Sequence, residues 1–220
     1  MTALVLVAAM SARGEQPADA GRWESDVRKF EAAHRERPLA PGGVLFIGSS
    51  SVRLWTTLQS DFPGLRVINR GVGGSQIPEI TALAHRIVIP YKPRLIVFYC
   101  GSNDLASGRS AEQVISDFRA FVTRIHGVLP DVRIAFVSIA SNPARAMLAV
   151  SFTEVNRAIE RYATADPRVD FIDVNTAMLG ADGRPRPDIF VDDQLHMNER
   201  GYRIWRAVIG EYLMRELPAD

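Results

Sequence analysis

Hydrophobic residues along this chain form short runs that alternate with segments of helical spacing. Five of the runs are almost continuously apolar, which is typical of buried strands. Such strands are covered on both faces, so the pattern predicts a parallel sheet with helices on either side. The predicted strands are Val44–Ile47, Arg66–Asn69, Leu95–Tyr99, Ile134–Ile139 and Phe171–Val174.

The segments between the runs place apolar residues three or four positions apart, as amphipathic helices do. Ser110 is suited to a helix N-cap, and Pro78 to the first turn of a helix. Together the elements predict an α/β protein, a flavodoxin-like three-layer α/β/α sandwich around a central five-stranded parallel sheet. The predicted helices are Trp23–Glu36, Ile77–Val88, Ala111–Val128, Ala146–Ala165 and Glu199–Leu217.

The composition is that of an ordinary globular domain, and it narrows the classes of partner. The 220 residues carry a net charge of +1, and the arginines are interleaved with acidic residues. A nucleic-acid site or an anionic membrane surface attracts clustered basic charge, so neither partner is expected. Cys100 is the only cysteine, which excludes an intrachain disulfide and leaves no set of cysteines to bind a metal.

The first twenty residues do not follow the strand and helix pattern. Ala3–Met10 is an apolar run too short to span a bilayer, and small residues follow it, as at a signal-peptide cleavage site. The usual basic segment before the run is missing. We interpret residues 1–20 as a residual signal-like extension, with a disordered tail as the alternative. The expected location is periplasmic or secreted, or else cytoplasmic, and residues 21–220 are predicted to form one domain without a transmembrane segment.

The residues that follow the predicted strands are the candidates for chemistry, because open parallel sheets bind ligands beyond the carboxyl ends of their strands. A serine on a tight turn can expose its hydroxyl as a nucleophile, and a glycine-rich loop can turn N–H groups toward an anion. An asparagine amide can donate to an oxyanion. Each segment alone is also compatible with an ordinary turn. The segments are Gly48–Ser51, Asn69–Ser75 and Gly101–Asp104.

Asp193 and His196 lie three residues apart, so one turn can present a carboxylate and an imidazole together. A histidine base needs a carboxylate on its Nδ1–H, which fixes the tautomer. The other histidines, His34, His85 and His126, fall within predicted helices and are interpreted as ordinary residues. No spacing typical of a zinc site, a dinucleotide loop or a P-loop occurs, so no metal and no cofactor are expected.

Taken together, these segments resemble the four sequence blocks of the SGNH hydrolases, also called the GDSL lipase/esterase family. The likeness extends from about Gly43 to Gly201, with the blocks in the family's order. One departure is Ser49, which stands where the family has the aspartate of its Gly-Asp-Ser block. The matching blocks are Phe46–Ser50, Asn69–Gly74, Gly101–Asp104 and Asp193–His196.

The resemblance implies a role for particular residues. Alignment on Gly48 selects Ser50 among the three consecutive serines, Ser49, Ser50 and Ser51. The D-x-x-H spacing selects Asp193 rather than Asp192. The implied roles are nucleophile for Ser50, base for His196, orienting carboxylate for Asp193, and oxyanion donors for Ser50, Gly74 and Asn103.

The resemblance also implies an activity, that of a serine esterase that cleaves carboxylic esters of a small molecule through an acyl-enzyme. Short-chain acyl or acetyl esters are the expected substrates. A carbohydrate deacetylase, a lysophospholipase or a thioesterase remain open, and a non-catalytic binding module on the same fold is the alternative outside this chemistry. Part of the pocket is expected to be lined by the loop Ala140–Phe152, with Asn142, Arg145, Met147 and Leu148. Nothing in the sequence indicates an oligomeric state.

Overall fold

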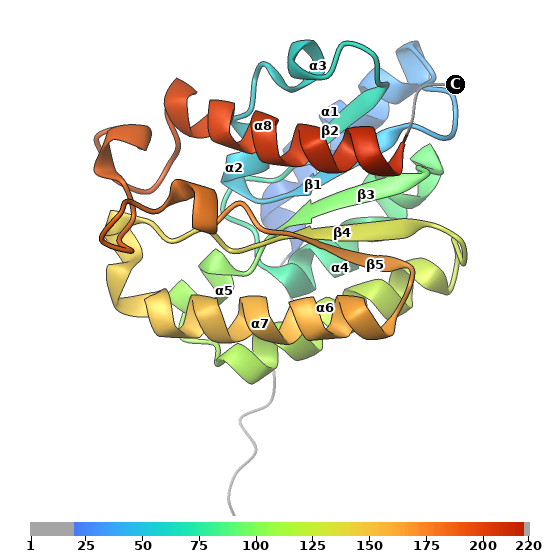
Figure 1. Ribbon diagram of the computed structural model, residues 1–220. Coiled ribbons are helices and arrows are strands. Elements are labelled where there is room, and N and C mark those ends of the chain that lie inside the picture. Colours follow the sequence, from blue (N-terminus) through green and yellow to red (C-terminus); the bar gives the residue numbers. More distant parts are fainter. Residues whose placement is uncertain (1–19, 218–220) are drawn as a thin grey trace, which may run out of the picture.

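A five-stranded parallel sheet forms the middle layer of the protein (Figure 1). The strand order is β2-β1-β3-β4-β5, which is the flavodoxin-like order. The computed structural model describes residues 20–217. The extension predicted at residues 1–20 therefore lies outside the described residues, except for residue 20. The strands are β1 Val44–Gly48, β2 Val67–Gly71, β3 Leu95–Tyr99, β4 Arg133–Val137 and β5 Val169–Ile172.

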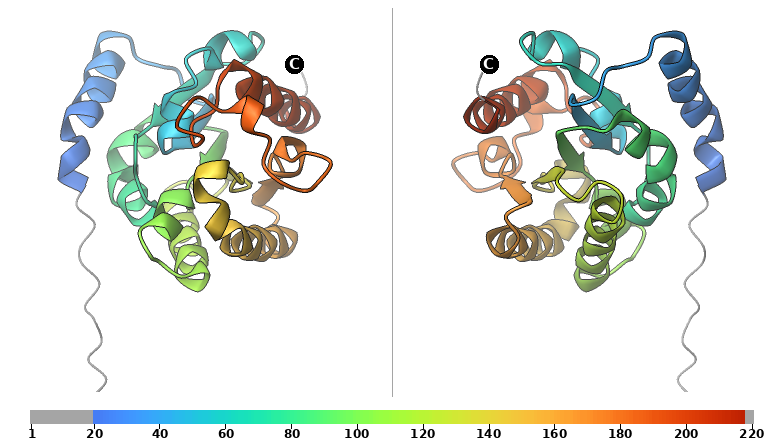
Figure 2. Two further views of the ribbon diagram at one scale, coloured as in Figure 1. Left: turned by 90° about the vertical axis from the view of Figure 1, so that its left-hand side faces the viewer. Right: turned by 90° about the vertical axis from the view of Figure 1, so that its right-hand side faces the viewer.

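Helices cover both faces of the sheet, as the two side views show (Figure 2), so the predicted three-layer sandwich is confirmed. One face packs against α1, α4, α6 and α7, and the other against α2, α3 and α8. The α-helices are α1 Glu24–Glu36, α2 Ser50–Arg53, α3 Leu58–Asp61, α4 Ile77–Ile87, α5 Ser102–Ala106, α6 Ala111–His126, α7 Ala149–Ala165 and α8 Glu199–Glu216. Short 3-10 helices also occur: η1 Ala20–Trp23, η2 Ile89–Tyr91, η3 Pro143–Leu148, η4 Thr176–Met178 and η5 Pro187–Ile189. Within residues 20–217, no helix combines the length and the apolar character required to cross a bilayer.

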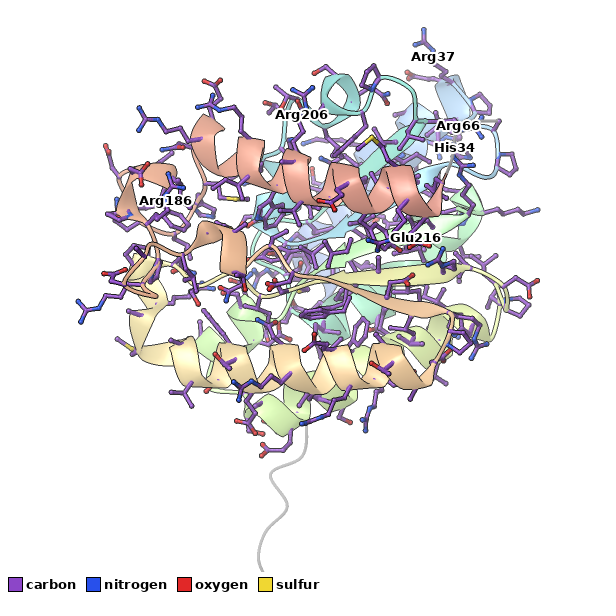
Figure 3. The ribbon with its side chains drawn as sticks, viewed as in Figure 1. His34, Arg37, Arg66, Arg186, Arg206 and Glu216 are labelled. Atoms are coloured by element: carbon purple, nitrogen blue, oxygen red, sulfur yellow. The ribbon has the colours of Figure 1, made fainter. Side chains whose placement is uncertain are left out.

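The amino ends of two strands are fastened to the end of α8. Arg133 at the start of β4 donates to both carboxylate oxygens of Asp170 in β5, at 2.8 Å, and to Glu216 of α8, at 2.9 Å. Glu216 lies at the right-hand end of α8 in Figure 3, and Arg186 lies on the loops at the left-hand end. The loops that follow the strands therefore gather at the other end of the sheet, away from this ion-pair cluster.

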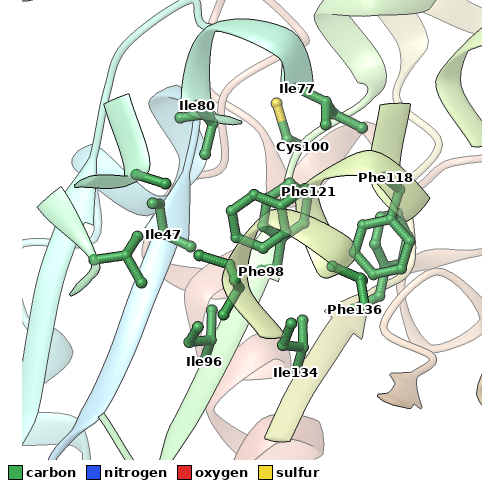
Figure 4. Packing of buried hydrophobic residues seen from close by; sticks show 14 of the residues in the cluster. Ile47, Ile77, Ile80, Ile96, Phe98, Cys100, Phe118, Phe121, Ile134 and Phe136 are labelled. Atoms are coloured by element: carbon green, nitrogen blue, oxygen red, sulfur yellow. The ribbon is translucent and has the colours of Figure 1, made fainter. Parts of the chain in front are cut away.

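The core on the α4–α6 side is built around aromatic side chains of the central strands (Figure 4). The ring of Phe98 in β3 lies 4.5 Å from that of Phe121 and 5.4 Å from that of Phe118, both in α6. Phe136 of the next strand adds a further ring to this cluster. All four side chains are fully buried, so the central strands are fixed against α6 by packing.

Two strands end earlier than the hydrophobic runs predict, and side chains explain the difference. The predicted strand Ile134–Ile139 stops at Val137, because Asn156 of α7 takes both the N–H and the carbonyl of Ile139. The predicted strand Phe171–Val174 is found at 169–172, because Ser138 Oγ accepts the N–H groups of residues 174 and 175. The segments that follow β4 and β5 thus leave the sheet at its carboxyl end.

Candidate active site

Ser50 is the first residue of α2, and Ser49 alone separates it from the end of β1. The turn between them requires a glycine, because a Cβ on Gly48 would lie 1.9 Å from the carbonyl oxygen of Tyr99 in the neighbouring strand. Ser49 is the N-cap of α2 and is buried. Because α2 begins here, the Ser50 N–H has no hydrogen-bond acceptor among residues 20–217 and remains available to a ligand.

His196 lies between Ser50 and Asp193 in one hydrogen-bonded chain. Its Nε2 is 2.9 Å from Ser50 Oγ, although the two residues are 146 positions apart in the sequence. Its Nδ1 is 2.6 Å from Asp193 Oδ2. Asp192 is exposed and forms no hydrogen bond or ion pair with His196. The structure therefore brings together the serine, the histidine and the one of two adjacent aspartates that the D-x-x-H spacing selects.

The turn that carries this pair is held by its own backbone. Asp193 Oδ1 accepts the N–H groups of Leu195 and His196, each at 2.9 Å. Hydrogen bonds to the His196 backbone and ring lower the pKa of Asp193 to about 2, so its carboxylate is ionised at neutral pH. Gln194 adopts the left-handed conformation, with φ of 55°, and the N–H of Val191 closes the turn on the His196 carbonyl at 2.9 Å.

The three predicted oxyanion donors lie on separate segments; Ser50 and Asn103 line one cavity, and Gly74 belongs to the neighbouring glycine-rich loop, whose Ser75 carbonyl accepts from Asn103. Gly74 has φ of 74°, a conformation that favours glycine, and its N–H has no acceptor within the described part of the chain. Asn103 Nδ2 donates to the carbonyl of Ser75 at 3.1 Å, which leaves its second amide hydrogen for a ligand. Asn103 Oδ1 accepts from Arg145 at 2.9 Å. These two bonds together fix which way the amide of Asn103 faces.

The glycine-rich loop is held from outside by residues that sequence reasoning missed. Trp23 Nε1 donates to the carbonyl of Gly73 at 2.9 Å, and Arg22 donates to the carbonyl of Gly74 at 3.1 Å. The sequence pattern assigns Trp23 only to an apolar helix face. Its indole nitrogen is a donor that needs a partner when buried, and this is the one signal that could have indicated such a contact.

Two further polar residues brace the elements around the site. Asn69 at β2 donates to the carbonyl of Val52 in α2, at 2.7 Å, which fastens α2 to the sheet. Asp104 accepts the N–H of Ile77, at 2.9 Å, and thereby holds the start of α4 just after the glycine-rich loop. Asp104 is fully buried, and burial raises the pKa of its carboxyl to about 6.

A cavity of about 20 Å³ opens beside Ser50, with room for roughly one water-sized group. Its inner wall includes Tyr99, Met178 and Trp205, all nearly or completely buried. Of the loop expected to line the pocket, Asn142 and Arg145 do so, but Met147 does not: it is 88% exposed. Leu148 packs against the core instead.

A larger hollow of about 920 Å³ lies between α3 and α8. Phe62, Met214 and Leu217 are among the residues that line it, and none of the predicted site residues does. We assign the chemistry to the smaller cavity, because the Ser50 hydroxyl, the His196 imidazole and the Asn103 amide all line it.

The remaining histidines bond only to nearby backbone. His34 Nδ1 accepts the N–H of Leu39, His85 lies 2.9 Å from the carbonyl of Ala82, and His126 lies 3.0 Å from that of Val132. In Figure 3 His34 lies at the opposite end of the protein from Arg186 and the site loops. Among the described residues, no three His, Cys, Asp or Glu side chains form a group that could hold a metal ion.

A flavodoxin-like fold with hydrogen-bonded Ser, His and Asp side chains at the carboxyl end of its sheet is an arrangement typical of hydrolases. Residues 48–204 match the GDSL-like Lipase/Acylhydrolase family. The match covers most of the chain, so the protein belongs to this family and is a hydrolase that acts on ester bonds. No curated protein matches the sequence.

Solved structures from several organisms share the fold. A Streptococcus pneumoniae protein provisionally named a platelet activating factor has a TM-score of 0.76 at 18% identity, over 88% of this chain and 94% of its own. A GDSL-like lipase from Bacteroides thetaiotaomicron has a TM-score of 0.69 at 18% identity, over 91% and 99%. A carbohydrate esterase family 3 protein from Talaromyces cellulolyticus has a TM-score of 0.63 at 20% identity, over 80% and 97%. At such identities the similarity concerns the fold alone.

Proposed function

We propose that the protein is a serine esterase that hydrolyses short-chain acyl esters of small molecules through an acyl-enzyme. The observation that carries the proposal is the hydrogen-bonded chain from Ser50 Oγ through His196 to Asp193, with distances of 2.9 and 2.6 Å. A serine hydroxyl is a weak nucleophile unless a positioned base takes its proton. In the proposed reaction the imidazole is that base, and the carboxylate stabilises the imidazolium.

The proposed reaction has two steps. Ser50 Oγ attacks the ester carbonyl and His196 Nε2 takes its proton; the imidazolium then protonates the departing alcohol, which leaves an acyl group on the serine. Water, deprotonated by His196, attacks this acyl group; the imidazolium then returns the proton to Ser50 Oγ as the bond to the serine breaks and the acid is released. The oxyanion of each step is held by the N–H groups of Ser50 and Gly74 and the amide of Asn103. Each such donor typically lowers the barrier by roughly 3–4 kcal/mol.

The size of the cavity supports a short acyl group. About 20 Å³ beside Ser50 is enough for a methyl group but not for a long alkyl chain. The inner wall is made of buried Met178 and Trp205, the latter hydrogen-bonded to the former at 3.1 Å, so enlarging the cavity would disturb the core. Acetyl esters, including those of carbohydrates, fit this cavity better than the long-chain substrates of a lysophospholipase.

The proposal is tested by active-site labelling and turnover. A fluorophosphonate probe should label the native protein, and mass spectrometry of the digest should place the adduct on Ser50 rather than on Ser49 or Ser51. Heat-denatured protein is the control and should remain unlabelled. Ser50→Ala should reduce hydrolysis of 4-nitrophenyl acetate by roughly 10⁴-fold or more with an unchanged circular-dichroism spectrum. Wild-type turnover by this variant, or an adduct on another serine, would show that the assignment is wrong.

A further inference from the structure

Arg145 is a half-buried cation in the candidate active site. It belongs to η3, and its side chain lines the cavity together with Ser50 and His196. Its Nη1 donates to Ser102 Oγ at 2.7 Å, and its Nη2 donates to Asn103 Oδ1 at 2.9 Å. Both acceptors are uncharged, so these hydrogen bonds do not neutralise the guanidinium.

Other partly buried arginines of this protein have a charged or aromatic partner. Arg86, Arg109 and Arg133 each lie within 2.6 to 2.8 Å of a carboxylate oxygen. Arg70 lies over two aromatic rings. Arg145 has no carboxylate at ion-pair distance within residues 20–217, and no Asp or Glu is among the described residues that line its cavity. Burial accordingly lowers the pKa of the Arg145 guanidinium.

The backbone around Arg145 is fixed, so its side chain starts from a defined position. The N–H of Ala144 donates to the carbonyl of Gln194, at 3.1 Å, and the N–H of Arg145 donates to Asn142 Oδ1, at 3.0 Å. A guanidinium has five N–H donors, and only two are used by Ser102 and Asn103. The Nε of Arg145, unlike the Nε of Arg70, is not among the fully buried polar atoms that lack a hydrogen-bond partner.

The dimensions of the cavity decide which half of an ester would meet this charge. About 20 Å³ beside Ser50 takes an acetyl methyl group and leaves no room for an acyl chain that ends in an anion. Arg145 is half-buried, whereas Met178 and Trp205 of the same lining are almost completely buried, so Arg145 lies on the solvent side of the cavity, where the larger alcohol half must lie. On the esterase function proposed above, we propose that Arg145 recognises an anionic oxygen group, a carboxylate or a phosphate, on the alcohol half of the substrate. A guanidinium fork matches the geometry of both groups.

A matched set of acetate esters tests this proposal. The anionic substrates are 4-acetoxybenzoate and 4-acetoxyphenyl phosphate, and the neutral reference is methyl 4-acetoxybenzoate. We expect the wild type to prefer at least one anionic ester, with the preference expressed in KM. In Arg145→Gln the ratio of kcat/KM between that ester and the neutral one should fall about tenfold, the value of one charge-assisted contact. If the ratio falls for 4-acetoxybenzoate, Arg145 recognises a carboxylate; if it falls for 4-acetoxyphenyl phosphate, Arg145 recognises a phosphate.

Controls separate recognition from positioning. Arg157→Gln removes an exposed arginine of α7 that does not line the cavity, and it should leave the ratio unchanged. Arg145→Lys retains the charge without the fork and should keep part of the preference. If Arg145→Gln slows charged and neutral esters equally, Arg145 acts only through Asn103 and the proposal is overturned. An unchanged ratio with full activity overturns it as well. If the wild type hydrolyses none of the esters, the esterase function itself fails.

Discussion

Trp23 is hydrogen-bonded to the peptide group that contains the N–H of Gly74. The indole of Trp23 holds the carbonyl oxygen of Gly73, and in a trans peptide that oxygen points opposite to the N–H of the next residue, here Gly74. The hydrogen bond therefore fixes the direction of the N–H that we propose as an oxyanion donor. A side chain fifty positions upstream, in η1, thus orients a backbone group of the site.

Trp23→Phe should lower kcat about tenfold while changing KM little, because a looser donor acts chiefly on the transition state. The measurement is steady-state hydrolysis of 4-nitrophenyl acetate. Trp55→Phe is the matched control: it removes an indole hydrogen bond to Asp61, at 2.6 Å, on the opposite face of the sheet. That variant should lose stability and retain its kcat. Equal losses of kcat in the two variants would contradict the proposal that Trp23 orients the N–H of Gly74.

Asp193→Asn should reduce kcat at least a hundredfold, because an amide in place of the carboxylate favours the wrong imidazole tautomer and withdraws the charge from the imidazolium. Asp192→Asn offers a neighbouring control, since Asp192 is exposed and does not bond to His196. It should retain activity within about twofold. Because the pKa of Asp193 is about 2, its carboxylate should remain ionised down to about pH 4, so acid loss of activity above that pH should not follow its titration.

Acyl-chain length should limit turnover sharply. We expect kcat/KM for 4-nitrophenyl esters to fall at least tenfold from acetate to hexanoate, because the cavity beside Ser50 has a volume of only about 20 Å³. Met178→Ala should widen the cavity and weaken this dependence, at a loss of about 2–5 kcal/mol in the free energy of unfolding. A wild type that prefers hexanoate would contradict the assignment of this cavity to the acyl group.

Asp104 should make the free energy of unfolding depend on pH. Burial raises its pKa from 3.8 to about 6, so the folded state binds this proton more tightly than the unfolded chain does. Its contribution should be greatest below pH 3.8, fall as the pH rises to about 6, and then stay constant, a change of up to about 3 kcal/mol.

The variant Asp104→Asn isolates this effect, because its amide oxygen can still accept the N–H of Ile77 and its side chain does not titrate. Urea unfolding of both proteins between pH 4 and pH 7 gives the difference directly. The variant should gain stability relative to the wild type as the pH rises. A difference that stays flat over this range would mean that Asp104 is ionised in the fold throughout.

The architecture could be predicted from the sequence because strand and helix signals are local. β1 and β3 are continuous apolar runs, and their carboxyl ends bring the motif blocks to one edge of the sheet. The helix α2 was missed because four residues carry too little periodicity to be recognised. The end of β4 was misplaced because it depends on Asn156, a residue of the following helix.

The hydrogen bonds that hold the site in place could not be predicted, because their partners are distant in the sequence. The partners of Trp23 and Asn69 lie 50 and 17 positions away, and those of the Arg145 side chain about 42. Contacts of this range exist only once the layers have packed, and no motif contains both members of any pair. Motif spacing can thus indicate which residues share a site, but the hydrogen bonds that orient them belong to the tertiary structure.

The bond between His196 and Ser50 closes a loop of 146 residues, from the end of the first strand to the turn before the last helix. Closing so long a loop requires the intervening strands to be in place. Turnover would then report the completion of folding: after dilution from denaturant, helical circular dichroism should recover before hydrolysis does. In such an experiment the substrate itself becomes the probe of the last step in assembling the chain.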